Sequence, residues 1–226
     1  MAALPTVTEV SRTSLLCGRL TLGAAAQEKA GFASHAALLA QSRAGTPPRL
    51  FHKGDLADAT NLAPEVRAAI ADPHQRVIGV VYNPITDESF YAARGAGAFL
   101  NGAELPLRAG ATELRDAVAG VDFKRISHHL GDELAVRPPY YSQRNFGSSA
   151  LEWCYVAAGR LDVYIHGGQM LWDYAAGRLI LEEAGGSYSS LGGTPLTAGP
   201  AIKRSVIAAA SPALFEQWRT WLHAHA

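Results

Sequence analysis

Short apolar runs separated by turn residues constrain this chain more than any other feature of its sequence. From residue 76, the run 77–82 ends at Asn83-Pro84, and 89–93 follows it as an expected hairpin partner. Asn101-Gly102, a pair typical of type I′ turns, separates a second pair of short runs, and 117–123 predicts a further strand. Each run is too short for a helix of ordinary length, so this part of the chain favours β-sheet.

Helical patterns join the strands in the second half of the chain. A helix is expected over 150–158, with Ser149 and Glu152 as a capping box and Gly159 as its stop. A strand over 161–165, a loop over 166–169, a helix over 172–184 and strands over 187–191 and 205–210 follow. Ser211-Pro212 then caps a last helix. His128-His129 is expected in a polar loop. The fold class is therefore mixed α/β, with sheets covered by helices.

The first 75 residues differ from the rest, because they are rich in Ala and Leu and predict helices over 6–22 and 33–41. The character of the sequence therefore changes at about residue 75, and we expect 1–75 and 76–226 to form one compact unit.

Composition excludes several classes of protein. The chain has 226 residues, of which 48% are hydrophobic and 18% charged, which argues against disorder. Twenty basic and twenty acidic residues give no net charge, so neither nucleic acid nor an anionic membrane is an expected partner. The apolar runs are too short to span a bilayer, no secretory signal is recognisable, and the chain has only two cysteines. These features predict a cytoplasmic protein.

Three groups of residues are candidates for chemistry. Gly147-Ser148-Ser149 opens an expected helix, where backbone N–H groups either cradle a phosphate or form an ordinary N-cap. Asp173 begins another helix and either ligates a hard cation or complements the helix dipole. Asp55, Asp58 and Thr60 follow the pattern Asp-x-x-Asp-x-Thr, which suits either a cation site or a solvated loop.

Several segments in order resemble the inositol monophosphatase family over about residues 76–210. They are Gly79-Val80-Val81-Tyr82-Asn83-Pro84, the run 94–102, Gly147-Ser148-Ser149-Ala150-Leu151, the run 154–162, and Trp172-Asp173-Tyr174-Ala175-Ala176-Gly177. The resemblance implies a layered α-β-α-β-α sandwich and a Mg²⁺-dependent phosphomonoesterase acting on a small polyol or sugar phosphate. It makes 1–75 a shortened helical and metal-loop region and 76–226 the inositol-monophosphatase-like core with the C-terminal α/β region. It also implies that Asp173 ligates metal, that Gly147, Ser148 and Ser149 bind substrate, and that the protein is a homodimer.

The N-terminal third departs from that family, whose main metal motif reads Asp-Pro-Ile/Leu-Asp-Gly-Thr after a Glu-Glu pair. The closest match here keeps Asp55, Asp58 and Thr60 but lacks the Pro and the Gly, and no Glu-Glu pair precedes it. Another alignment makes 53–61 an earlier family segment, in which case the metal motif is missing. His166 also stands where many members carry a Glu that holds a substrate hydroxyl.

Our hypothesis is that Asp55, Asp58 and Asp173 hold Mg²⁺, or Mn²⁺, while Asp58 and Thr60 act in catalysis and Thr60 orients the attacking water. Gly147, Ser148, Ser149 and His166 would bind the substrate. The alternatives are a pseudo-phosphatase scaffold without a metal cluster, or a related sugar bisphosphate or sulfonucleotide phosphatase.

Overall fold

The computed structural model describes residues 25–40, 78–106, 108–196 and 203–226, and the chain divides into two units, Met1–Val66 and Arg67–Ala226. In the first unit the described residues form helix α2 (Ala25–Ala33) and the short helix α3 (Ala36–Leu39). Only 36–39 of the helix expected over 33–41 is therefore a separate helix. The helix expected over 6–22 lies outside the described residues.

A four-stranded antiparallel sheet opens the described part of the second unit. Its strands follow the chain order, β1 (Ile78–Asn83), β2 (Glu88–Ala93), β3 (Ala98–Leu100) and β4 (Ala103–Glu104). Both expected hairpins are confirmed. Asn101 and Gly102 have φ angles of 49° and 89°, the positive values that a type I′ turn requires at both central positions.

A five-stranded sheet with the order β6-β5-β7-β9-β8 forms the other half of the unit. Its strands are β5 (Val118–Asp122), β6 (Ser142–Arg144), β7 (Val163–Met170), β8 (Ser187–Ser189) and β9 (Lys203–Ala209). Strand β5 is parallel to β6 and β7, whereas β9 is antiparallel to β7 and β8.

The loop expected over 166–169 is wrong, because β7 continues through this segment to Met170. Strand β5 pairs with β7 as far as His166, and β9 pairs with both ends of the segment across an irregularity between His166 and Gln169. The two glycines that suggested a loop instead allow a bulge inside a paired strand.

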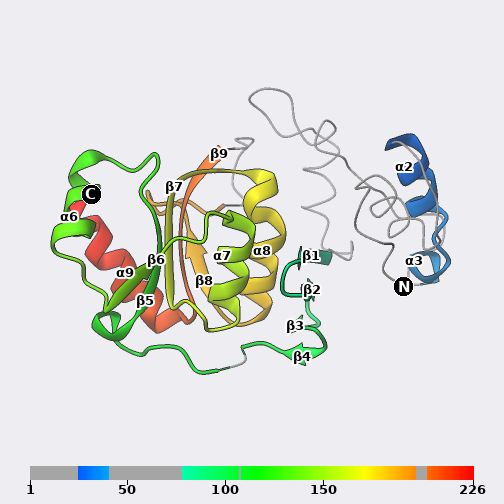
Figure 1. Cartoon of the computed structure of the whole chain (residues 1–226), viewed down its shortest axis with the longest axis horizontal. Helices are drawn as coiled ribbons and strands as arrows, with labels where there is room; N and C mark the ends of the chain where they lie inside the picture. Colours follow the sequence, from blue (N-terminus) through cyan, green and yellow to red (C-terminus); the bar gives the residue numbers. More distant parts are fainter. Residues whose placement is uncertain (1–24, 41–77, 107, 197–202) are drawn as a thin grey trace. The chain divides into compact units, whose positions relative to one another are not determined.

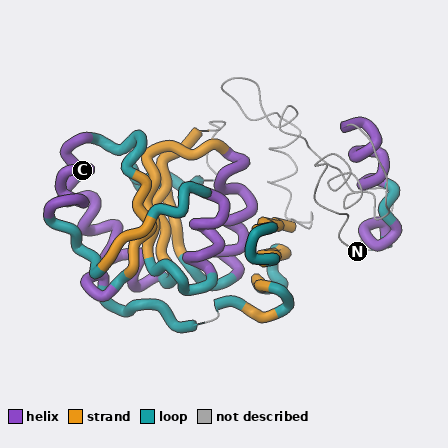
Figure 2. Tube along the Cα trace, in the orientation of Figure 1, coloured by secondary structure: helices purple, strands orange, loops and turns teal. Residues whose placement is uncertain are grey.

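Helices lie on both sides of the five-stranded sheet, as Figure 1 and Figure 2 show. On one side are α7 (Ser149–Ala157) and α8 (Leu171–Glu183), and α8 also contacts β1, β2 and β3 of the other sheet. On the other side are α6 (His128–Val136) and α9 (Pro212–His225), with the 3₁₀ turn η1 (Leu114–Asp116) against α9. The layers β, α, β and α confirm the sandwich class.

Helix α6 corrects the loop expected at His128-His129. Ser127 caps this helix, its hydroxyl accepting the N–H of Leu130, and Leu130 and Leu134 are fully buried in the core beneath α9. The start of this helix was not predicted, because it begins with two adjacent histidines and the apolar residues of its buried face come later.

Glycines allow the layers to approach closely. A Cβ at Gly177 of α8 would lie 2.4 Å from the Cβ of Trp153 in α7, and one at Gly79 of β1 would lie 2.9 Å from the carbonyl oxygen of Ala176. Helix α8 therefore packs closely against α7 and β1, because Gly177 and Gly79 have no side chains at these contacts. Within the described residues, no helix is both long and apolar enough to cross a membrane.

Candidate active site at the carboxyl edge of the five-stranded sheet

Two helices begin at the edge of the sheet where the parallel strands β5 and β7 end. Helix α7 leads through Gly159 into the start of β7, so its own N-terminus lies toward the opposite end of that strand. Helix α8 begins directly after Met170, the last residue of β7. Free N–H groups at helix starts attract anions, and this edge of an open α/β sheet is a common ligand site.

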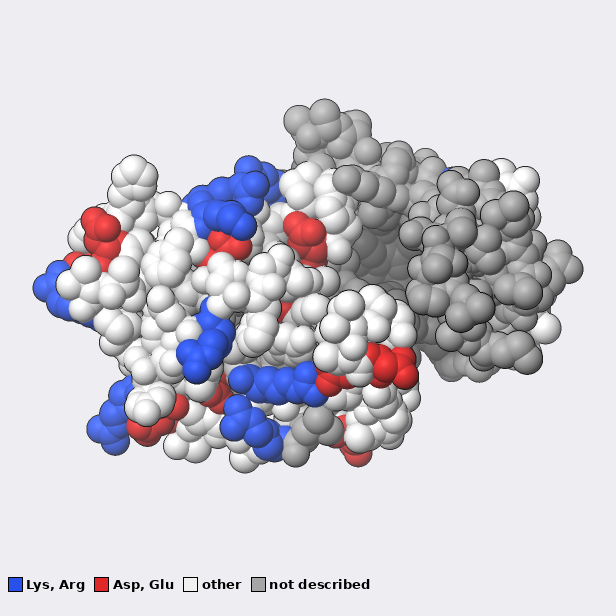
Figure 3. Space-filling model, viewed as in Figure 1, with Lys and Arg blue, Asp and Glu red and all other residues white. Residues whose placement is uncertain are grey.

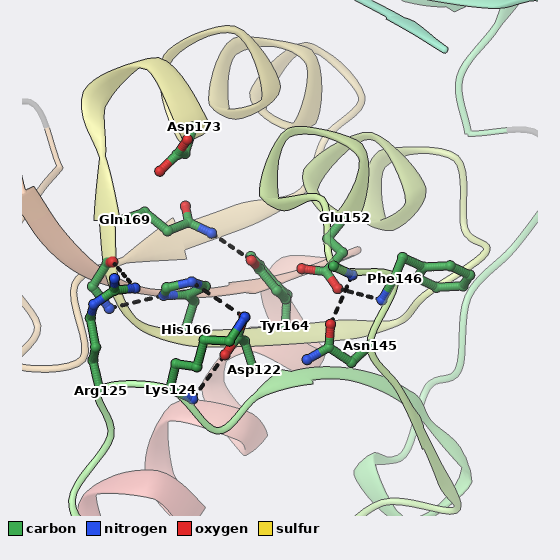
Figure 4. A network of polar contacts seen from close by, with 12 residues as sticks. Asp122, Lys124, Arg125, Asn145, Phe146, Glu152, Tyr164, His166, Gln169 and Asp173 are labelled. Carbon is green, nitrogen blue, oxygen red and sulfur yellow. Dashed lines mark hydrogen bonds and ion pairs between the residues drawn. The ribbon is translucent and has the colours of Figure 1, made fainter. Parts of the chain in front are cut away.

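The turn before α7 exposes its backbone. Gly147 has a φ of +71°, and a Cβ built there would meet nothing within 4 Å. The Oδ1 of Asn145 accepts the N–H of Gly147 at 2.8 Å, which holds the turn in shape (Figure 4). Ser148 is the N-cap and Ser149 the first helical residue, and Ser148 makes no side-chain cap bond. The three predicted substrate residues therefore lie together at one helix start.

Glu152 does not form the expected capping box with Ser149. Its Oε1 instead accepts the N–H of Phe146 at 2.9 Å, before the helix begins, because α7 starts one residue earlier than the box requires. Glu152 is 1% exposed, and burial raises the pKa of its carboxyl. The Glu152 side chain thus fixes the backbone that leads into the Gly147 turn.

Asp173 occupies the third position of α8 and is half-buried. Its Oδ2 accepts the N–H of Met170 at 2.9 Å, which stabilises the helix start. This bond uses one carboxylate oxygen. The helix-start role suggested by the sequence is confirmed, and it leaves a second oxygen with the chemistry of a cation ligand.

Gln169 lies between Asp173 and Tyr164 in Figure 4, and its hydrogen bonds connect β7 to α7. Its Oε1 accepts the indole N–H of Trp153 at 2.8 Å, and its amide donates to the hydroxyl of Tyr164. All three residues are fully buried. Such a satisfied polar chain fixes the floor of the site rigidly.

Asp122 and His166 form a buried pair at the ends of β5 and β7, with 5% of each residue exposed. The Nε2 of His166 lies 3.5 Å from Oδ2 of Asp122, and its Nδ1 accepts the N–H of Gly168 at 2.9 Å. Since Nδ1 accepts, the ring proton is assigned to Nε2. Burial lowers the pKa of His166, although Asp122 opposes this, so the ring is neutral at pH 7.

Two cationic residues follow β5 at the same edge. The Nζ of Lys124 lies 3.8 Å from Oδ2 of Asp122. Arg125 has a φ of 66°, and its Nη1 lies 3.5 Å from the carbonyl oxygen of Gly168. A Cβ at Gly167 would lie 2.0 Å from the carbonyl oxygen of Arg125, so the backbone after β5 crosses directly over β7.

The predicted ligands Asp55, Asp58 and Thr60 lie outside the described residues. Within the described part of the chain, no three His, Cys, Asp or Glu side chains gather as a metal cluster. Asp173, Gly147, Ser148, Ser149 and His166 do lie at one edge of the sheet. The sequence analysis did not identify Asp122, Arg125 and Gln169 as members of this edge. The only signal in the sequence was a polar residue at the end of an apolar strand.

The model of the family described as "Inositol monophosphatase family" matches residues 66–225 of this chain. The chain belongs to the inositol monophosphatase family. The inositol-1-monophosphatase of Mesorhizobium japonicum is 40% identical over 133 residues, which cover 57% of this chain and 50% of the relative. The Nus factor SuhB of Pasteurella multocida is 34% identical over 168 residues, covering 68% of this chain and 62% of the relative.

Solved structures in this family agree with the fold. Inositol monophosphatase-II of Staphylococcus aureus superimposes with a TM-score of 0.59 at 27% identity, covering 67% of this chain and 58% of that one. The extragenic suppressor protein suhB of Bartonella henselae superimposes with a TM-score of 0.57 at 35% identity, covering 65% of this chain and 57% of that one. This inositol monophosphatase family member spans about half the length of the first curated relative above.

Proposed function

We propose that this protein is a Mg²⁺-dependent phosphomonoesterase that hydrolyses a small polyol or sugar phosphate. One observation carries the proposal: Asp173 stands at the start of α8, at the sheet edge where the exposed turn 147–149 opens α7. A metal-dependent phosphate site needs a carboxylate that binds the cation and backbone N–H groups that bind the anionic phosphate. Membership of the inositol monophosphatase family supports the same reaction class.

Asp173 fits a role as metal ligand. It is half-buried, one oxygen is fixed by the N–H of Met170, and Mg²⁺ prefers carboxylate oxygens. Asp173 together with Asp55 and Asp58 would hold Mg²⁺, or Mn²⁺ in its place. When bound, the metal neutralises charge on the phosphoryl oxygens and acidifies a water molecule.

The protein's own groups bind and orient the ester. The N–H groups at the start of α7 bind phosphoryl oxygens, and Gly147 lets the ester approach the backbone because no side chain covers it. The carboxyl of Glu152 keeps this turn in place through the N–H of Phe146. Thr60 would orient the attacking water, so no side chain has to act as a nucleophile.

Replacing Asp173 tests the proposal. We expect Asp173→Asn to lower phosphate release from inositol 1-phosphate in Mg²⁺ by about a hundredfold or more, as loss of one key electrostatic group does. Stability should fall by only about 0.3–1 kcal/mol, the worth of a charge at a helix start. Asp116→Asn, at an exposed carboxylate of η1, is the control and should retain activity. Wild-type turnover in Asp173→Asn would contradict the assignment.

A scaffold without activity is the competing reading. If the wild-type chain neither releases phosphate nor binds Mg²⁺ or Mn²⁺ in a calorimeter, the pseudo-phosphatase describes it better. A substrate panel that includes sugar bisphosphates and sulfonucleotides tests the related phosphatases. The homodimer and the cytoplasmic location stay predictions, the former checked by sedimentation of the full chain.

A further inference from the structure

Two cationic side chains converge on one backbone position beside the proposed active site. Gly168 lies in the irregular part of β7, and a Cβ built there would lie 3.0 Å from Cε of Lys203 and 3.1 Å from Cδ of Arg125. Lys203 begins β9, and Arg125 follows β5. The two side chains therefore lie across the same glycine, although one comes from the segment after β5 and the other from the start of β9.

Neighbouring acids do not neutralise this pair. Within the described residues, no carboxylate oxygen lies within 4.0 Å of the charged nitrogens of Arg125 or Lys203. Asp122 faces Lys124 and His166 instead, and one oxygen of Asp173 accepts the N–H of Met170. Figure 3 shows Lys and Arg side chains gathered where Figure 1 places the β7 and β9 labels. Like charges held together attract an anion.

The polar groups around Gly168 also restrict what a ligand can present there. The ring of His166 is 5% exposed, and both of its nitrogens face protein groups. Arg125 and Lys203 are exposed, and they can only donate hydrogen bonds. A ligand group at this place must therefore accept hydrogen bonds and carry negative charge.

We propose that Arg125 and Lys203 form a subsite for a second acidic group of the substrate, either a phosphate or a carboxylate. This inference rests on the proposed phosphatase function, and it narrows the substrate to a polyol or sugar phosphate with two anionic groups. The subsite is separate from the reacting one. Figure 4 shows Arg125 and Asp173 at the same edge, with Gln169 between them. Arginine and lysine bind phosphates and carboxylates through charge-assisted hydrogen bonds.

Kinetics with matched substrates test the subsite. Phosphate release in Mg²⁺ is measured for fructose 1,6-bisphosphate, 6-phosphogluconate and fructose 6-phosphate, which carries a single acidic group. We expect wild-type protein to prefer at least one of the two doubly acidic compounds. A preference for the bisphosphate identifies a phosphate subsite, and a preference for 6-phosphogluconate identifies a carboxylate subsite. Equal kcat/KM for all three would overturn the proposal.

The double variant Arg125→Gln/Lys203→Gln links that preference to the two residues. It should lower kcat/KM for the preferred compound about tenfold more than for fructose 6-phosphate, the loss expected for charged hydrogen bonds. Arg115→Gln, at an exposed arginine of η1, is the control and should change neither value. An equal loss for all three substrates would show general electrostatic attraction and overturn the subsite. Thermal unfolding verifies that the variants are folded.

A binding measurement separates this proposal from the phosphatase activity. Inorganic phosphate is titrated calorimetrically into the full chain in EDTA, where no metal-dependent turnover occurs. The wild type and Arg115→Gln should bind, and the double variant should bind about tenfold more weakly. Such binding without turnover in Mg²⁺ would refute the phosphatase and keep the anion site. Turnover with no preference and no dependence on Arg125 or Lys203 would refute the subsite alone.

Discussion

Buried ionisable side chains surround the candidate site, and each is held by the backbone. Glu152 accepts the N–H of Phe146, Asp122 accepts the N–H of Lys124 at 2.8 Å, and His166 accepts that of Gly168. Burying a charged group is costly unless hydrogen bonds compensate. These residues therefore fix the shape of the sheet edge at the candidate site. Substitutions at them test whether each side chain has a structural or a chemical role.

Glu152 provides a pH-dependent prediction. Burial raises the pKa of this carboxyl above its value of 4.5 in the unfolded chain. Between those two pKa values the native state binds more protons, so Glu152 lowers stability as the pH rises through its native pKa. Glu152→Gln removes the titration and keeps an oxygen that can accept the N–H of Phe146. We expect the variant to gain stability relative to the wild type between about pH 4 and pH 8.

Urea unfolding at both pH values measures this difference. Glu104→Gln, at an exposed carboxyl of β4, serves as the control and should show no comparable change. A stability difference between Glu152→Gln and the wild type that is the same at both pH values would contradict the raised pKa.

At the scale of elements, some boundaries followed from local chemistry and others did not. The Asn101-Gly102 turn was predictable because few residue pairs tolerate two positive φ angles. The segment 166–169 was not, because pairing with β5 and β9 overrides the turn tendency of two glycines. The start of α7 was wrong by one residue, which is enough to replace a capping box by a contact of Glu152 with Phe146.

The contact between α7 and α8 gives a second prediction. A Cβ at Gly177 would lie 2.4 Å from that of Trp153, so Gly177→Ala forces the two helices apart. We expect a loss of about 1–3 kcal/mol in the free energy of unfolding, typical of overpacking. Gly131→Ala in α6 is the matched control, because its nearest contact would be an ordinary 3.8 Å.

The control should behave in the opposite way. Alanine in a helix interior is more favourable than glycine, so Gly131→Ala should be neutral or stabilising by up to about 1 kcal/mol. Denaturant unfolding of both variants makes the comparison. Equal effects at the two glycines would show that α7 and α8 are not in tight contact at Gly177.

At the scale of the whole molecule, the two sheets of the second unit enclose α7 and α8, while α6 and α9 cover the far side of the larger sheet (Figure 1). Cys154 lies in α7 inside these layers and is fully buried. Burial also raises the pKa of its thiol. Its thiol can therefore report opening of the layers.

Labelling of Cys154 should therefore follow unfolding. In a Cys17→Ser background, we expect a thiol reagent to react about a thousandfold more slowly with the native protein than with the protein in denaturant, given ordinary domain stability. The rate should rise with denaturant in parallel with loss of helical circular dichroism. Fast labelling under native conditions would mean that α7 opens locally.

The sequence by itself determined most of the strands and helices and the mixed α/β class, because turn residues and apolar periodicity act over short distances. The sandwich and the family followed from the segments that resemble the inositol monophosphatase family. The sequence also placed Asp173 and the turn 147–149 at helix starts. Only the tertiary structure decided that these helix starts meet at one sheet edge, that Asp122 faces His166, and that Arg125 and Lys203 share Gly168. Those contacts depend on strand order and on the bulge in β7, where residues far apart in the chain are brought together by pairing that no local pattern encodes.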